Sequence, residues 1–204
     1  MNRIKRKQAI IDTICSLGFL GIIRLFRDII ISFLVLNFNS IIRWPFYIRS
    51  LGKLQIGKNF RVGPGAVIDI LDKNAIITIG HSFRASSRLH IGCISKVSIG
   101  DNVLIASDVY ISDHSHGHYS GSEQSDADSI VNIRDLFTAP IVISNNVWIG
   151  EKVCILPGVN IGENSIIGAL SVVKNDVLPN SIYAGCPARR VKMYDPILNE
   201  WVKV

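Results

Sequence analysis

A period of six residues constrains the fold of this chain more than any other feature. From Ile143 to Val173 an aliphatic residue returns at every sixth position without a slip in register, and a small or apolar residue follows each one four positions later. A second run covers Ile99 to Ile111, and a rougher one covers Ile56 to Ile68. So short a repeat does not suit a solenoid of helix pairs, but it suits a coil of short parallel strands in which each repeat supplies one flat side.

The repeat predicts an all-β core in which three hexapeptides make one triangular coil, with about six coils in all. β-branched residues suit the flat sides, and Gly or Asn suits the tight backbone of the corners. A chain of 204 residues has room for one such domain and a small appendage. We therefore expect an N-terminal helical segment in residues 1–53, the β-helix in residues 54–192 and a C-terminal tail in residues 193–204.

The N-terminal segment carries most of the positive charge. Residues 1–53 hold nine Lys or Arg against two Asp, whereas the rest of the chain holds thirteen basic and fourteen acidic side chains. Because the excess positive charge lies in this segment alone, the net charge of +6 does not indicate that the chain binds nucleic acid. Residues 9–36 are very apolar, but four charges interrupt them, and the longest clean run, Ile29 to Leu36, is too short to span a bilayer.

Two interpretations of this segment remain open. In one it is an interfacial helix whose basic residues, Arg3 to Lys7, contact the inner membrane surface. In the other it is a helical arm that packs against the core or against a neighbouring subunit. The charges within the apolar stretch argue against a secretory signal. The four cysteines lie far apart, as expected of reduced thiols in a cytoplasmic protein.

The register of the repeat is lost after Ile111 and resumes about thirty residues later. The residues between, 112–140, are polar and predict a long loop extruded from the coil, and such loops on rigid scaffolds often carry function. Histidine is the side chain best suited to take a proton near neutral pH. Three histidines lie at the root of this loop, His114, His116 and His118. Each could be a catalytic base, a solvated loop residue or a metal ligand.

Three motifs accompany the repeat. They are Asp-His shortly after Ile111, Ala-Pro-Ile-Val-Ile-Ser-Asn-Asn-Val-Trp-Ile-Gly at 139–150, and Gly-Ala-Leu-Ser-Val-Val at 168–173 with Ala-Gly-Cys-Pro-Ala-Arg at 184–189. Together they resemble the hexapeptide-repeat acyltransferase superfamily, and within it the galactoside, nodulation and O-antigen or capsule O-acetyltransferases. The resemblance implies a left-handed parallel β-helix, which is an exception to the right-handed crossover rule. It also implies a homotrimer with active sites between neighbouring chains.

The same resemblance assigns roles to single residues. It makes His114 the general base, with His116 as the runner-up, and places Trp148 in the wall of the acceptor cleft. Asp113 belongs with the residues near the substrate, but strand alternation predicts that its side chain points away from His114 and does not orient the imidazole.

The resemblance also implies where acetyl-CoA, the acetyl donor, binds. The pantetheine arm follows the outside of the C-terminal coils, along the backbone near Gly150, Gly168 and Ala169. Basic side chains beyond the last coil hold the phosphates, and the candidates are Lys174, Arg189, Arg190 and Lys192.

The activity implied is direct transfer of an acetyl group to a sugar hydroxyl, because proximity in one cleft can replace a covalent intermediate. The acceptor would be a surface polysaccharide or its lipid-linked precursor, and no metal is expected. Three alternatives remain: N-acetylation of an amino sugar, an activity like that of zinc carbonic anhydrases, and a non-catalytic trimeric scaffold.

Overall fold

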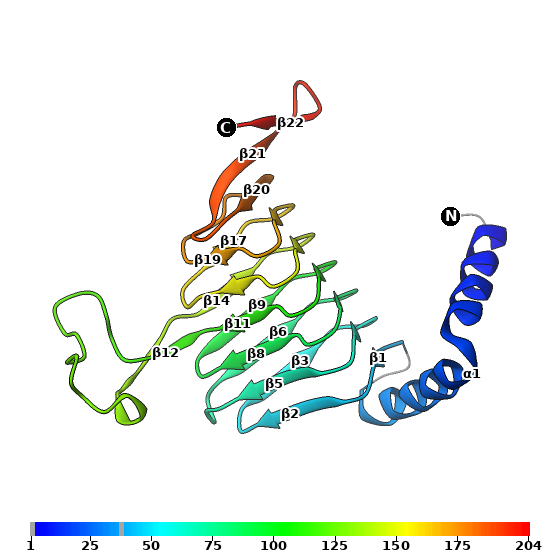
Figure 1. Ribbon diagram of the computed structural model, residues 1–204, viewed down its shortest axis with the longest axis horizontal. Helices are drawn as coiled ribbons and strands as arrows, with labels where there is room; N and C mark the ends of the chain where they lie inside the picture. The colour runs from blue at the N-terminus through cyan, green and yellow to red at the C-terminus, as the bar shows by residue number, and fades with distance from the viewer. Residues whose placement is uncertain (1–2, 37–38) are drawn as a thin grey trace.

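The computed structural model describes residues 3–36 and 39–204, which form a bent helix followed by a parallel β-helix (Figure 1). Between residues 39 and 204 the strands pass around a triangular coil and pair in parallel with the strands one coil away. This arrangement gives three long sheets, which we call sheets A, B and C in the order in which the chain crosses them. The parallel β-helix predicted from the six-residue period is confirmed.

Each sheet collects one side of every coil, and the described residues give sheets of nine, six and five strands. Sheet A contains, in spatial order, β1 (Ile41–Ile42), β4 (Arg61–Val62), β7 (Arg84–Ala85), β10 (Leu104–Ile105), β15 (Trp148–Ile149), β18 (Ile166–Ile167), β20 (Ser181–Ala184), β21 (Arg189–Asp195) and β22 (Glu200–Lys203). Sheet B contains β2 (Phe46–Ser50), β5 (Ala66–Ile70), β8 (His90–Cys93), β11 (Tyr110–Ser112), β16 (Cys154–Ile155) and β19 (Val172–Val173). Sheet C contains β3 (Lys53–Ile56), β6 (Ile76–Ile79), β9 (Lys96–Ile99), β14 (Ile141–Ile143) and β17 (Asn160–Ile161).

The core lies inside the coil and is built from the repeating aliphatic positions. Burial of one Ile or Val side chain contributes about 1.5–3 kcal/mol, so a repeated aliphatic position stabilises each coil in turn. The six positions of the clearest run are at most 1% exposed, and they are Ile143, Ile149, Ile155, Ile161, Ile167 and Val173. The period read from the sequence is therefore the period of the buried side chains.

The corners of the coil use the left-handed backbone conformation. Where sheet C passes to sheet A, Asn146, Asn164 and Asn180 adopt positive φ angles of 56°, 59° and 53°. Their side-chain amides form a ladder, with Nδ2···Oδ1 distances of 2.8 and 2.9 Å between successive coils. Asn tolerates this conformation better than most residues, but other corners place Ser82, Arg88, Asp108, Lys152 and Leu170 in it. The expectation of Gly or Asn therefore covers only some of the corners.

An insert interrupts the fourth coil between β11 and β14. Within it, β12 (His114–His116) pairs antiparallel with β13 (Leu136–Thr138), and a short 3-10 helix, η1 (Val131–Ile133), precedes β13. Figure 1 shows this insert in green, extending to the left of the coil. The insert is thus a hairpin-like projection anchored at its base.

Both predicted ends of the β-helix need correction. β1 and β2 lie within residues 1–53 but pair with β4 and β5, so the coil begins at Ile41 and not at residue 54. Residues 193–204 are not a separate tail, because β21 and β22 continue sheet A as an antiparallel hairpin. The first coil was missed because β2 and β5 are five residues long and break the six-residue spacing.

Helix α1 (Arg3–Val35) bends at Gly18, where the φ angle is +62°. Its second half is fixed to the first coil by polar contacts. The carboxylate of Asp28 is buried and pairs with Arg43 (Nε–Oδ2 2.8 Å), and the Ser32 hydroxyl accepts a hydrogen bond from the Ile42 N–H (2.7 Å). The side chains of residues 3–17, including Arg3 to Lys7, lie outside the described part.

Most of the large apolar side chains described on α1 do not face the core of this chain. Exposed apolar side chains occur along the described part of the helix, and they include Phe19, Leu20, Ile23, Phe26, Ile30 and Leu34. An arm that buries its apolar residues against its own core does not fit this exposure. Within the described ranges, no helix combines the length and the apolar character that a crossing of a lipid bilayer needs.

Candidate active site

His114 lies where the chain leaves sheet B, at the start of β12. Its ring Nδ1 is 3.1 Å from Asp113 Oδ1 and 3.3 Å from the Ser112 hydroxyl. Its side chain is 13% exposed, so the imidazole is largely enclosed but still reaches solvent. A donated Nδ1–H hydrogen bond leaves Nε2 free to accept a proton.

Asp113 is itself held by the neighbouring coil. It has no exposed surface, and its carboxylate accepts hydrogen bonds from three consecutive backbone N–H groups between β8 and β9. The Ile94 N–H donates to Oδ1 (2.9 Å), and the N–H groups of Ser95 and Lys96 donate to Oδ2 (2.8 Å each). The carboxylate therefore has a fixed position from which it can orient His114.

The charge state of Asp113 follows from these contacts. Burial alone raises the pKa of a carboxyl group, but the hydrogen bonds from His114, Ile94 and Ser95 outweigh it and lower the pKa of Asp113 below its ordinary value of 3.8. Asp113 is thus ionised at neutral pH. An ionised acceptor at Nδ1 favours the tautomer with its proton on Nδ1 and stabilises the imidazolium that forms when Nε2 takes up a proton.

Two expectations for Asp113 are therefore wrong. Its side chain points toward His114 and not away from it, because the chain turns out of sheet B after Ser112 and strand alternation ends there. The role of a substrate ligand does not fit either, since the carboxylate has no exposed surface. The sequence signal that could have identified the contact is the loss of repeat register directly after β11.

Cys93 is the other titratable group beside this carboxylate. Its thiol lies 3.4 Å from Asp113 Oδ2, and burial together with the negative charge of Asp113 raises the pKa of Cys93 to about 12. A neutral, buried thiol is a poor nucleophile. Cys93 therefore supports the carboxylate and does not offer a covalent route for the acetyl group.

Gly92 provides the space that the His114 ring occupies. Gly92 pairs with Ser112 across β8 and β11, and a Cβ atom at Gly92 would lie 3.2 Å from Cε1 of His114. That distance is shorter than ordinary van der Waals contact, so a side chain here would displace the imidazole. Cε1 is bonded to Nε2, and the proposed base therefore lies against the outer face of β8.

The three histidines of the insert do not converge on one point. His116 is exposed, and its backbone carbonyl accepts a hydrogen bond from the Tyr119 hydroxyl. The ring of His118 packs edge-on against Phe137, with centroids 5.4 Å apart. In the part of the chain that the structure describes, no group of three or more His, Cys, Asp or Glu side chains is arranged to hold a metal ion.

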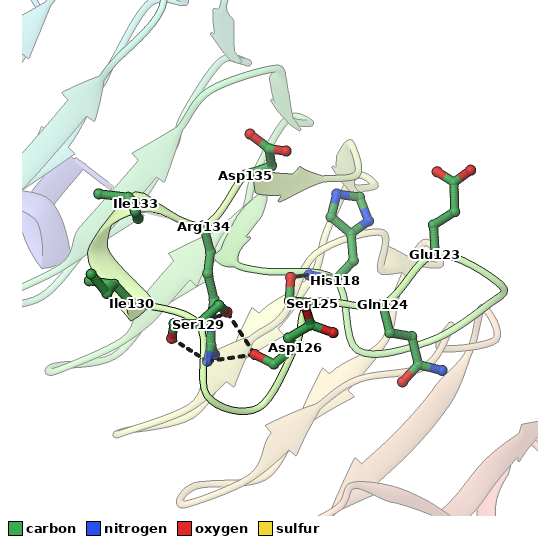
Figure 2. Close-up of a pocket in the computed structure, with 10 residues that line it drawn as sticks. All are labelled: His118, Glu123, Gln124, Ser125, Asp126, Ser129, Ile130, Ile133, Arg134 and Asp135. Atoms are coloured by element: carbon green, nitrogen blue, oxygen red, sulfur yellow. Dashed lines mark hydrogen bonds between the residues drawn. The ribbon is translucent and has the colours of Figure 1, made fainter.

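A pocket of about 430 Å³ lies within the insert (Figure 2). Arg134 organises its wall: the guanidinium donates to the Ser129 hydroxyl (2.8 Å), to the Tyr119 hydroxyl (2.9 Å) and to backbone carbonyls that include those of Asp126 and Ser129. Figure 2 shows the contacts of Arg134 with Ser129 and Asp126 left of the centre of the view, with Glu123 at the right. Of the three histidines, only His118 lines this pocket. The pocket is therefore separate from the His114–Asp113 pair.

The predicted pantetheine residues lie together on one corner. Gly150 and Gly168 follow β15 and β18 where sheet A passes to sheet B, and the Gly150 N–H donates to the Ile167 carbonyl on the next coil (2.8 Å). A Cβ atom at Gly150 would lie 2.6 Å from the backbone nitrogen of Ala169, so only glycine allows the coils to stack this closely. Successive coils are therefore in close backbone contact at this corner, where Gly150 is buried, Gly168 is partly exposed and Ala169 is exposed.

The basic candidates are divided between faces. Arg189 pairs with Ala184 at the top of the same corner, directly above Gly168. Arg190 lies on the opposite face of β21 from Arg189, since side chains alternate along a strand. A register shift at Val191 interrupts this alternation before Lys192, which pairs with Ile182 further along β21. Lys174 is exposed directly after β19 in sheet B. Arg189 is thus the basic residue that continues the corner.

Trp148 lies apart from His114 in the single chain. It is half-exposed on β15 of sheet A, whereas His114 projects from the corner between sheets B and C. One chain therefore does not bring these two predicted site residues into a common cleft.

Comparisons with known proteins identify the family of the chain. Residues 140–175 match the model for bacterial transferase hexapeptide repeats. WbbJ of Escherichia coli K12, a candidate O-acetyl transferase of lipopolysaccharide biosynthesis, is 36% identical over 187 residues, which cover 91% of this chain and 95% of that protein. The chain belongs to the hexapeptide-repeat transferase family. The family and the β-helix implied by the sequence motifs are confirmed.

Solved structures of acetyltransferases in this family share the fold. Galactoside acetyltransferase in complex with coenzyme A is 32% identical, with a TM-score of 0.51 over 74% of this chain and 66% of that chain. A hexapeptide-repeat acetyltransferase of Vibrio cholerae in complex with acetyl coenzyme A is 29% identical, with a TM-score of 0.50 over 76% of this chain and 68% of that chain. The chain is therefore an acyltransferase by family.

Proposed function

We propose that this chain transfers the acetyl group of acetyl-CoA to a hydroxyl of a sugar, in a surface polysaccharide such as O-antigen or capsule or in its lipid-linked precursor. The observation that carries the proposal is the pairing of His114 with the buried, ionised Asp113 at the root of the insert. The names of WbbJ and of galactoside O-acetyltransferase of Escherichia coli, which is 42% identical over 57% of this chain, support a sugar hydroxyl as the acceptor.

The chemistry requires one proton acceptor and no covalent intermediate. His114 Nε2 takes the proton of the sugar hydroxyl while the oxygen bonds to the acetyl carbon, and Asp113 stabilises the imidazolium. A backbone N–H at the cleft stabilises the oxyanion. The carbon–sulfur bond then breaks, and the thiolate of CoA leaves and takes up the proton from Nε2 of His114, which returns the imidazole to its neutral state.

Acetyl-CoA is proposed to lie along the corner between sheets A and B. The close stacking at Gly150 and Gly168, whose N–H groups donate to carbonyls of the next coil, keeps side chains away from the path of a pantetheine arm. Arg189 stands at the end of that corner for the phosphates. Ala169 is exposed next to this path, whereas Arg190 and Lys174 lie on other faces and Lys192 lies beyond the register shift in β21. Arg189 is therefore the first candidate for the phosphate contact.

A homotrimer belongs to the same proposal. Trp148 and His114 lie on different sides of one coil, so a cleft that contains both needs a neighbouring subunit. Three-fold packing of the triangular coil meets this requirement, with each chain supplying one part of each site. Light scattering should give the mass of three chains, and the mass of one chain at working concentration would contradict the proposal.

Peripheral contact of α1 with the inner membrane surface is also proposed. The exposed apolar residues of α1, such as Phe19 and Phe26, accompany basic residues such as Arg24, which is the pairing expected of an interfacial helix. A cytoplasmic site of action fits the unpaired thiols of Cys93, Cys154 and Cys186.

The proposed function is tested by incubating the protein with acetyl-CoA and a panel of methyl glycosides of galactose, glucose, rhamnose and N-acetylglucosamine. Release of CoA thiol and a mass increase of one acetyl group on a glycoside are expected. An amino-sugar glycoside is added to the panel. If only its nitrogen is acetylated, the activity is N-acetyltransfer and not O-acetyltransfer. No transfer to any sugar would contradict the proposal.

A further inference from the structure

Four outward-facing residues of sheet B form one column across neighbouring coils. Arg49 pairs in register with Asp69, Asp69 with Gly92, and Gly92 with Ser112. The strands of a sheet lie about 4.8 Å apart, so adjacent members of the column are in reach of each other. His114 lies over the gap that Gly92 leaves, and the carboxylate of Asp69 therefore stands next to it on the same face.

This carboxylate holds a second histidine. The Asp69 side chain is 6% exposed and receives a two-pronged hydrogen bond from Arg49, with Nε–Oδ1 and Nη2–Oδ2 distances of 2.8 Å. Its Oδ2 is also 3.3 Å from Nε2 of His90. The hydrogen bond from Arg49 is the main reason that the pKa of Asp69 lies below its ordinary value, and the contact with His90 acts in the same direction. Asp69 is thus an ionised anchor for His90.

His90 remains accessible although it is anchored. Its side chain is 43% exposed, and its ring packs edge-on against that of Tyr110, with centroids 5.3 Å apart. When Nε2–H donates to Asp69, Nδ1 becomes a free hydrogen-bond acceptor. The site thus combines an oriented acceptor with the partly exposed ring of Tyr110, a combination that suits a hydroxyl and the apolar C–H groups of a sugar.

The spacing between the two histidines fits one sugar ring. His90 and Gly92 face outward two residues apart on β8, which corresponds to about 7 Å along the strand. His114 lies over Gly92, so its imidazole and that of His90 are separated by about this length. Two neighbouring hydroxyls of a single pyranose can reach both imidazoles when their hydrogen bonds, each about 2.8 Å long, are inclined to the line between the two rings.

The geometry points to His90, oriented by Asp69 and Arg49, as a second acceptor-binding group of this enzyme. The acceptor is a neutral pyranose that places one hydroxyl on His114 for acetylation and a second hydroxyl on Nδ1 of His90. This inference rests on the proposed sugar O-acetyltransfer and specifies the shape of its acceptor. No sequence pattern indicates this pair, since His90 and Asp69 belong to different repeats and meet only through the stacking of coils.

The inference is tested with His90→Ala on the methyl glycoside that the wild-type enzyme acetylates and on the analogues of that glycoside lacking one other hydroxyl. For the intact glycoside, kcat/KM should fall about tenfold, mainly through KM for the sugar, with KM for acetyl-CoA unchanged. For one deoxy analogue, kcat/KM of the wild-type enzyme should fall by the same factor, whereas kcat/KM of the His90→Ala variant should not fall further. That non-additivity identifies the hydroxyl bound by His90.

Two further variants separate binding from structure. His90→Gln retains a hydrogen-bonding group and should recover part of the loss, and His81→Ala removes a histidine from a distant corner and should behave as wild type. If every deoxy analogue lowers kcat/KM by the same factor in the wild-type enzyme and in His90→Ala, the inference is overturned. An unchanged KM for the sugar in His90→Ala would also overturn it. If the wild-type enzyme acetylates no glycoside, the proposed function fails instead, and the two failures are distinguished.

Discussion

At the scale of single residues, the site depends on the carboxylate of Asp113, which is buried away from solvent. Three backbone N–H groups from the neighbouring coil fix Asp113, and Asp113 in turn fixes Nδ1 of His114. The free Nε2 owes its position to this chain of contacts and to the missing side chain of Gly92. The base is therefore oriented before any substrate binds, which reduces the reorganisation needed in the transition state.

Replacing Asp113 by Asn should lower kcat at least about tenfold, and by less than removal of the base itself. The amide cannot accept hydrogen bonds from His114 and from all three backbone donors, whereas the corner proposed to bind CoA is unaffected. The affinity for CoA, measured by calorimetry, should stay within twofold of the wild-type value. An unchanged kcat would contradict the orienting role of Asp113.

The same variant should change the pH dependence of stability. In the unfolded chain the carboxyl group titrates at its ordinary pKa of 3.8, and its folded pKa is lower. The stabilisation by the ionised carboxylate is therefore present above about pH 4 and is lost as the pH falls through the folded pKa. Urea unfolding should show the largest difference between wild type and Asp113→Asn at neutral pH, with the difference shrinking below pH 4. A constant difference from pH 7 to pH 2 would count against this account.

The choice of His114 from sequence and the failure to see its partner have one physical origin. The repeat register identifies which residue follows the last strand before the insert, so His114 stays the predicted base. Strand alternation then predicts that Asp113 faces the other way, but alternation holds only while the chain remains in the sheet. His90 and Asp69 were missed because contacts between coils depend on register in three dimensions, which one sequence period does not specify.

At the scale of elements, the coil and the insert differ in what stabilises them. The coil buries an aliphatic residue in each repeat, whereas none of residues 114–140 belongs to the buried core. The insert depends on the β12–β13 ladder and on the hydrogen bonds of Arg134. Sequence periodicity could predict the coil for this reason, and it could predict the insert only as a break in the pattern.

Replacing Arg134 by Ala should loosen the insert with little effect on the coil. The variant loses hydrogen bonds to Ser129, Tyr119 and three backbone carbonyls, so limited subtilisin digestion should cut within the insert faster than in wild type. The melting temperature should change by no more than a few degrees, because the core is untouched. Arg84→Ala, which removes an exposed arginine from sheet A, serves as the control. Equal digestion of the two variants would contradict this role of Arg134.

At the scale of the whole molecule, the insert and α1 project to different sides of the coil in the view of Figure 1. The helix is fixed to the first coil by the buried Asp28 and by Ser32, and its large apolar residues remain on the outside. Sequence composition could identify the apolar and basic character of this segment. It could not separate contact with lipid from contact with another subunit, because both cover the same kind of surface.

Replacing Phe19, Leu20 and Phe26 by Ser should abolish co-sedimentation with anionic vesicles while leaving the polar contacts of α1 with the first coil intact. Phe19 is 79% exposed, so its loss removes no core packing. Binding by the wild-type protein should weaken with salt and be weaker on neutral vesicles, since each basic residue near an anionic surface contributes about 1 kcal/mol. Retained sedimentation, or loss of assembly in the variant, would favour packing against a subunit.

The measurement that tests the central claim most directly is the rate of acetyl transfer by His114→Ala beside that of His116→Ala. General-base assistance contributes about 10²- to 10⁴-fold, so His114→Ala should lose that factor in kcat while it binds CoA as wild type does. His116 is exposed and distant from Asp113, and its removal should cost far less. A His114→Ala enzyme that keeps its rate would contradict the proposed mechanism, whichever result His116→Ala gives.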